Sequence, residues 1–95
     1  MAYGKKIVLN CLTGYKPAVG QLAEAFVRDR VKYVGVVGPD CSKIEDIIDD
    51  AGVGDGSSPW FILTASHEGE TLEDAIAFAE SLSDEYAGEV QIVEI

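Results

Sequence analysis

Basic side chains are missing from the second half of this chain. All seven lysines and arginines precede residue 44, whereas fourteen aspartates and glutamates follow it. Residues 1–43, with three acidic side chains, carry a formal charge of +4, and residues 44–95 carry −14. Nucleic acids and anionic membranes bind through basic patches, so we expect no direct binding to either.

Long apolar runs and cysteines are also scarce. No apolar stretch approaches the roughly 18 residues that a membrane-spanning helix needs, so none is predicted. The first ten residues lack the apolar segment of a signal peptide, and we expect a cytoplasmic protein. Two cysteines, Cys11 and Cys41, are too few for a disulfide framework, and free thiols are expected. No motif indicates a cofactor, and none is predicted.

Apolar periodicity divides residues 1–95 into alternating strands and helices of one domain. Strands are expected at 5–12, 32–37, 60–64 and 90–95, and helices at 17–30, 42–52 and 71–82, with loops at 54–59, 65–70 and 83–89. A capping box is expected at Ser42 and Glu45, and an N-cap at Thr71. Strands alternating with helices over short links predict an α/β domain with a parallel sheet.

The end of the first helix has an unusual residue. A helix that stops just before a strand usually closes with Gly or Asn in the left-handed conformation, but this chain has Arg30 there. We expect Arg30 to adopt that conformation at a cost of about 1 kcal/mol relative to Gly.

Two of the strands are expected to be buried on both faces. Residues 5–12 form a near-continuous apolar run, and residues 60–64 are apolar without alternation. We predict the order 2-1-3-4, as in flavodoxin-like (Rossmann-like) sheets, for a four-stranded sheet in a three-layer sandwich. Right-handed crossovers would then place the first helix on one face and the second and third helices together on the other.

This arrangement predicts two surfaces. The second and third helices would form one acidic face from Glu45, Asp46, Asp49, Asp50, Glu73, Asp74 and Glu80. On the other face, a single helix would leave the third and fourth strands uncovered. Exposed apolar area of that kind marks interfaces, so we expect a homodimer or a docked partner there. The alternative is that the first helix and the loop at 53–59 cover it.

Any ligand is expected beyond the carboxyl ends of the strands. The loops at that edge carry the candidate residues Thr13, Gly14, Tyr15, Lys16, Asp40, Cys41, His67 and Glu68. Cys41 and His67 could form a nucleophile–base pair, but no catalytic signature surrounds them and no catalytic residue is predicted. Their ordinary interpretation is a half-buried thiol and a solvated loop histidine.

Two further interpretations of this edge remain open. Cys11, Cys41 and His67 could bind zinc with a carboxylate, but the close cysteine pairs of structural zinc sites are absent, and no metal site is predicted. The loop at 13–16 could hold a phosphate at the start of the first helix. It matches no phosphate-binding motif, and a plain turn is the alternative.

Three stretches carry a resemblance to a known family. LTGYKP (12–17), VGVVGPDC (34–41) and LTASHEGET (63–71) are similar to a family of short bacterial α/β domains of unknown function. The similarity covers nearly the whole chain and implies a bacterial cytoplasmic setting. It implies no activity, substrate or catalytic residue.

Two classes of function remain. The first is a protein-binding or regulatory module whose acidic helix face meets a basic partner. The second is a small enzyme, or a domain that binds a small molecule or phosphate, through Tyr15, Lys16, Cys41 and His67 at the loop edge.

Overall fold

The structure, a computed structural model, describes residues 3–53 and 60–95. The loop expected at 54–59 lies outside these residues. The elements, in chain order, are β1 (Lys6–Asn10), α1 (Ala18–Arg28), β2 (Tyr33–Val37), α2 (Cys41–Val53), β3 (Leu63–His67), α3 (Leu72–Ser81), the short 3₁₀ helix η1 (Asp84–Tyr86) and β4 (Val90–Glu94). The predicted α/β class and order of elements are confirmed, and η1 lies where a loop was expected. Within 3–53 and 60–95, no helix is long and apolar enough to cross a membrane.

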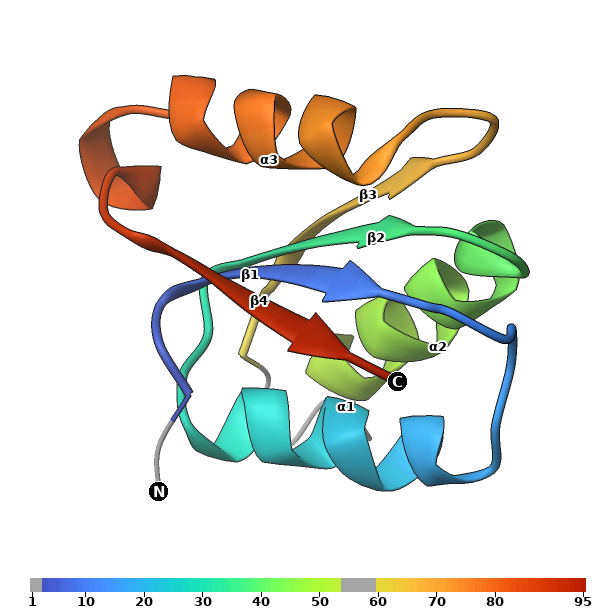
Figure 1. The fold of residues 1–95 in the computed structure, drawn as a ribbon. Coiled ribbons are helices and arrows are strands. Elements are labelled where there is room, and N and C mark those ends of the chain that lie inside the picture. Colours follow the sequence, from blue (N-terminus) through green and yellow to red (C-terminus); the bar gives the residue numbers. More distant parts are fainter. Residues whose placement is uncertain (1–2, 54–59) are drawn as a thin grey trace.

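All four strands are parallel, in the order β3-β2-β1-β4 (Figure 1). The predicted order 2-1-3-4 correctly made β1 central and β2 its neighbour. It wrongly placed β3 beside β1, since β3 pairs with the far side of β2 and β4 takes the place beside β1. The two central strands are therefore β1 and β2, and both edges of the sheet are formed by late segments of the chain.

The change in strand order also changes the helix layers. The steps from β1 to β2 and from β2 to β3 run in the same direction, so crossovers of one hand place α1 and α2 on the same face. The return from β3 to β4 reverses the direction and places α3 on the opposite face (Figure 1). The predicted placement, with α2 and α3 together and α1 alone, is wrong. Of the patch expected to be open beside α1, α2 covers the β3 part, and the β4 part remains partly open.

The wrong boundaries expected for β3 explain why the strand order was predicted wrongly. β3 begins at Leu63, three residues later than expected, and includes half of the segment expected to be a loop. The apolar residues before it have other roles: Trp60 donates its ring N–H to the Val31 carbonyl at 2.8 Å, and Ile62 is buried in the core. The strand itself is partly polar, with Thr64 and Ser66 on one face, as is typical of an edge strand.

Each face of the sheet has its own core. On one face, Ile7 and Leu9 of β1 pack with Phe26 of α1 and Ile44 and Ile48 of α2. On the other, Val8 and Tyr33 pack with Ala75 and Ala79 of α3. The alternation of Ile7, Val8 and Leu9 between the two cores shows why these three consecutive positions of β1 are all apolar.

The end of α1 confirms the expectation for Arg30, whose φ is 59°. The Arg30 N–H bonds to the Val27 carbonyl at 3.1 Å, and the Val31 N–H reaches back to Phe26 at 3.0 Å. This pair of bonds is a Schellman motif, and burial of Val31 beside Phe26 adds its usual apolar contact. The guanidinium also lies over the Trp60 ring, 4.9 Å from its centroid.

The starts of α2 and α3 differ. α3 has the expected N-cap at Thr71, and Asp74 completes a capping box with bonds of 3.1 Å in both directions. The capping box expected for α2 is not formed, because the helix already begins at Cys41. Glu45 instead accepts the Thr64 hydroxyl at 2.6 Å, which ties α2 to β3.

Lys6 joins β1 to the end of α3. Its side chain is buried beneath the helix, and its ammonium donates to the Ala79 carbonyl at 2.7 Å. A positive charge at a helix C-terminus satisfies carbonyls that have no partner within the helix and is favoured by the helix dipole. Lys6 therefore supports the only α-helix on this face within the described residues.

We predict that Lys6→Met lowers the free energy of unfolding by about 2 kcal/mol, because it removes a buried charge-assisted hydrogen bond. Urea denaturation would measure the change. The control is Lys5→Met, since Lys5 is exposed and makes only a 3.4 Å contact with the Arg30 carbonyl. If the two substitutions lowered the free energy of unfolding equally, the hydrogen bond from Lys6 to Ala79 would contribute nothing to stability.

We also predict that Arg30→Gly raises stability by about 0.5 kcal/mol. Relief of the left-handed arginine gains about 1 kcal/mol, and loss of an exposed cation–π contact takes back about 0.5 kcal/mol. In a Trp60→Leu background the cation–π contact is already absent, so the gain in stability from Arg30→Gly should approach about 1 kcal/mol. A denaturation midpoint that falls in both backgrounds would contradict the backbone argument.

Candidate functional site

The loop after β1 and the loop after β2 meet at the carboxyl edge of the sheet. The Asp40 carboxylate accepts the Tyr15 N–H at 2.9 Å, and a Cβ on Gly14 would lie 2.6 Å from the same carboxylate. Lys43 lies over the Tyr15 ring, 4.3 Å from its centroid. Thr13 is exposed beside this contact. The position where a phosphate would meet the loop amides therefore already contains an acidic side chain, which disfavours a phosphate there.

Cys41 and His67 do not come together. Cys41 begins α2 and is buried in the core shared by α1 and α2. His67 ends β3 and packs against Phe78 of α3, with ring centroids 5.4 Å apart. These positions lie on opposite faces of the sheet, so the two side chains form no nucleophile–base pair.

His67 is buried, not solvated as expected. Its Nδ1 lies 2.6 Å from the Glu70 carboxylate, while its Nε2 has no partner among the described residues. The Tyr33 hydroxyl is likewise buried without a partner, and its ring also packs near Phe78. Burial raises the pKa of Tyr33 to about 12, so its hydroxyl keeps its proton over the physiological range. These groups are enclosed under α3 and offer no open chemical site.

The two thiols are neighbours in one core. Cys11 and Cys41 are both free and buried. Burial, with smaller contributions from Cys41 and Asp40, raises the pKa of Cys11 to about 11. A thiol that stays protonated is a poor nucleophile and a poor metal ligand. Among the residues that the structure describes, no three His, Cys, Asp or Glu side chains gather to hold a metal ion.

The residues of the predicted acidic face are divided between the two sides of the sheet. Glu45, Asp46, Asp49 and Asp50 lie on α2, and Glu73, Asp74 and Glu80 lie on α3. Glu68, a candidate from the loop edge, bonds to the Ser42 hydroxyl at 3.3 Å. The single acidic surface expected from the sequence is therefore not formed.

A different acidic surface surrounds α3. Eight exposed carboxylates follow Glu68, and no lysine or arginine interrupts them in the sequence: Glu70, Glu73, Asp74, Glu80, Asp84, Glu85, Glu89 and Glu94. Lys6, beneath the helix, is buried and bonded to Ala79. Phe78 is 45% exposed on the same helix. We call this surface the acidic α3 side.

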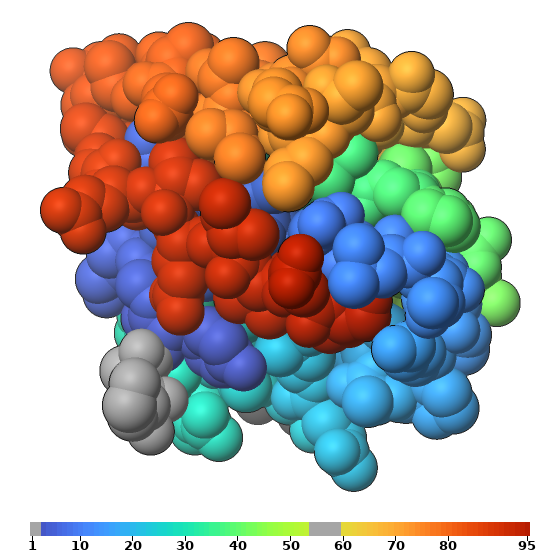
Figure 2. Space-filling view, in the orientation of Figure 1, coloured from blue at the N-terminus to red at the C-terminus, as the bar shows by residue number. Residues whose placement is uncertain are grey.

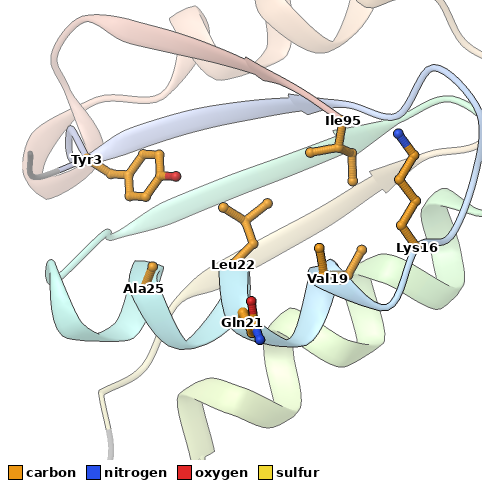
Figure 3. A pocket seen from close by; sticks show the side chains of 8 residues that line it. Tyr3, Lys16, Val19, Gln21, Leu22, Ala25 and Ile95 are labelled. Atoms are coloured by element: carbon orange, nitrogen blue, oxygen red, sulfur yellow. The ribbon is translucent and has the colours of Figure 1, made fainter.

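On the other face, a groove separates α1 from β4. Its volume is about 300 Å³, and it is lined by Tyr3, Lys16, Ala18, Val19, Gln21, Leu22, Ala25 and Ile95. Leu22 and Ile95 point toward each other across it, while Gln21 points away (Figure 3). In the space-filling view, β4 is exposed between the α3 layer and the α1 layer (Figure 2). We call this hollow the α1–β4 groove.

Sequence reasoning identified only Lys16 among the residues that line the groove. Leu22 and Val19 fit the pattern of a buried helix stripe, and Ile95 fits that of a strand. The signal that could have found the groove is the strand order, since ligands of open α/β sheets bind where that order reverses. Here the reversal lies between β1 and β4, beside the groove.

Comparison with known proteins adds a family without an assigned activity. Residues 15–95 match the family model of a domain of unknown function (DUF7684). No curated protein and no solved structure matches the chain.

The raised pKa of Cys11 predicts a loss of stability at alkaline pH. Between about pH 9 and pH 11 the thiol of the unfolded chain ionises while the buried thiol keeps its proton. The folded protein then binds more protons, so its free energy of unfolding falls as the pH rises. Denaturation at several pH values should show a smaller fall for Cys11→Ala than for the wild type. Val34→Ala, which removes no titratable group, should keep the wild-type pH dependence; identical profiles for all three would contradict the argument.

Proposed function

The chain belongs to the DUF7684 family of domains of unknown function, and we propose that it is a protein-binding module that meets a basic partner through the acidic α3 side. The observation that carries the proposal is the set of eight exposed carboxylates from Glu70 to Glu94, with no basic residue among them in sequence. An excess of charge of one sign raises the association rate of an oppositely charged partner. The excess remains although one basic side chain, Lys32, shares a hollow with Glu85.

The apolar part of such an interface is also present. Phe78 stands 45% exposed among these carboxylates, although its ring is held by Tyr33 and His67 beneath it. Interfaces commonly combine a buried aromatic residue with a polar rim, and a ring that is already fixed loses little entropy on binding. A partner segment that carries lysine or arginine beside an apolar side chain would match both features.

The same charge disfavours a homodimer through this side. A two-fold contact brings identical patches together, so the carboxylates of two copies would face each other. A homodimer, the partner expected from the sequence, would therefore have to use another surface of the molecule. The phosphate-binding alternative is weakened in a similar way by the Asp40 carboxylate at the Tyr15 amide.

The test is charge reversal with a matched control. Glu73→Lys with Glu80→Lys changes the exposed side of α3, and Asp46→Lys with Asp49→Lys makes the same change in net charge on α2. The probe is a fluorescein-labelled peptide of alternating lysine and leucine, followed by anisotropy at low and at physiological salt. We predict at least about tenfold weaker binding for the α3 variant, a much smaller loss for the α2 variant, and weaker binding as salt rises.

Two results would contradict the proposal. Equal losses for the two variants would mean that only net charge attracts the peptide. Unchanged binding by the α3 variant would remove the acidic α3 side from recognition. Phe78→Ser tests the apolar part separately and should weaken binding without changing its dependence on salt.

A further inference from the structure

We propose that the α1–β4 groove is a binding site for a small amphipathic carboxylate, a molecule with one anionic end and an alkyl or aryl body. This site lies on the face of the sheet opposite to α3, so it is independent of the proposed protein partner. Its volume of about 300 Å³ is at the small end of the range for ligand sites.

The walls of the groove are apolar along its length. Leu22 and Ala25 of α1 line one wall, Ile95 after β4 lines the other, and Val19 is buried at its base. Leu22 and Ile95 are only partly buried, although both touch the main core. A hydrocarbon body placed between them would remove apolar surface from water, which is the main source of affinity for such a ligand.

Lys16 supplies the charge at one end. Its side chain reaches toward Ile95 beside the mouth of the groove (Figure 3). Among the described residues its ammonium has neither an ion pair nor a hydrogen bond, unlike the buried Lys6. The first turn of α1 contains no acidic residue. A carboxylate there would meet a cation and no competing acid of that turn.

Tyr3 closes the opposite end. Its N–H donates to Asp29 at 2.9 Å, and its ring meets Phe26 edge-on with centroids 4.9 Å apart, so the ring is held in place. Its hydroxyl points along the groove (Figure 3). The groove therefore has a cation at one end, an apolar middle and a rigid aromatic limit at the other end.

These features favour a monoanion over other occupants. A phosphate group or a nucleotide needs several converging donors, whereas the groove offers one ammonium. A neutral hydrocarbon would leave Lys16 unused, and a cation would be repelled by it. One carboxylate with an apolar body of limited length satisfies both parts of the site.

The experiment compares three probes of equal chain length: octanoate, octanol and octylamine. Octanoate and octylamine are titrated below their micelle concentrations, and octanol below its solubility limit, into the protein labelled with nitrogen-15, and amide shifts are followed by NMR. We expect octanoate to shift the amides of Val19, Leu22 and Ala25, to bind about tenfold more tightly than octanol, and octylamine to bind more weakly than either.

Two pairs of variants locate the binding. Lys16→Met keeps the apolar stem and removes the charge, so octanoate should bind about tenfold more weakly and the affinity for octanol should not change. Lys43→Met is the matched control, and it should bind octanoate as tightly as the wild type does. Ala18→Phe, one turn before Leu22, should fill the groove and abolish the binding of all three probes. Ala77→Phe makes the same change on the exposed side of α3 and should have no effect.

Several results would overturn the proposal. These are equal affinities for octanoate and octanol in the wild type, no loss of octanoate binding with Lys16→Met, or shifts confined to residues outside the groove. Shifts at Val19 and Leu22 that follow protein concentration instead of octanoate would identify the groove as a contact between copies of the chain. None of these results bears on the acidic α3 side, whose variants lie on the opposite face.

Discussion

The pairing of β4 with β1 decides where both proposed binding surfaces of this protein lie. Two hydrogen bonds extend the pairing past the strand: the Ile95 N–H donates to the Asn10 carbonyl at 3.0 Å, and the Leu12 N–H donates to the Ile95 carbonyl at 2.9 Å. Because the chain must return from β3 at the far edge, α3 crosses the sheet on the face that α1 and α2 leave free. The acidic residues after β3 follow it there, and the α1–β4 groove opens on the other face.

Local sequence signals predicted the elements well because each depends on neighbouring residues. Ile7, Val8 and Leu9 alternate between two cores, so an unbroken apolar strand correctly indicated burial on both faces. Arg30 is left-handed because a Schellman motif requires that conformation whichever residue occupies the position. The order of strands depends on contacts between distant segments, and one local error was enough to change it: Ile62 is buried before β3 begins, which made an edge strand resemble a central one.

The candidate sites depended on that order and were predicted less well. Asp40 and Tyr15 meet because β1 and β2 are neighbours, as predicted, and both strands end at the same edge of the sheet. Cys41 and His67 occupy opposite faces because the helices after β2 and β3 do, which no spacing in the sequence indicates. Leu22 and Ile95 have the pattern of core residues, and they stay partly open because no helix of residues 3–53 and 60–95 covers β4 on that face.

The two proposed sites should respond differently to salt, and the geometry gives the reason. The acidic α3 side and the groove are separated by the sheet and its two packed layers, each about 10 Å thick, whereas the screening length at physiological ionic strength is about 8 Å. Added salt therefore weakens docking at the acidic α3 side. It also screens the repulsion that a net charge of −10 exerts on any anion approaching Lys16. Salt also screens the attraction between the anion and Lys16. It therefore has two opposing effects on anion binding in the groove, whereas at the acidic α3 side it only weakens binding of the basic partner.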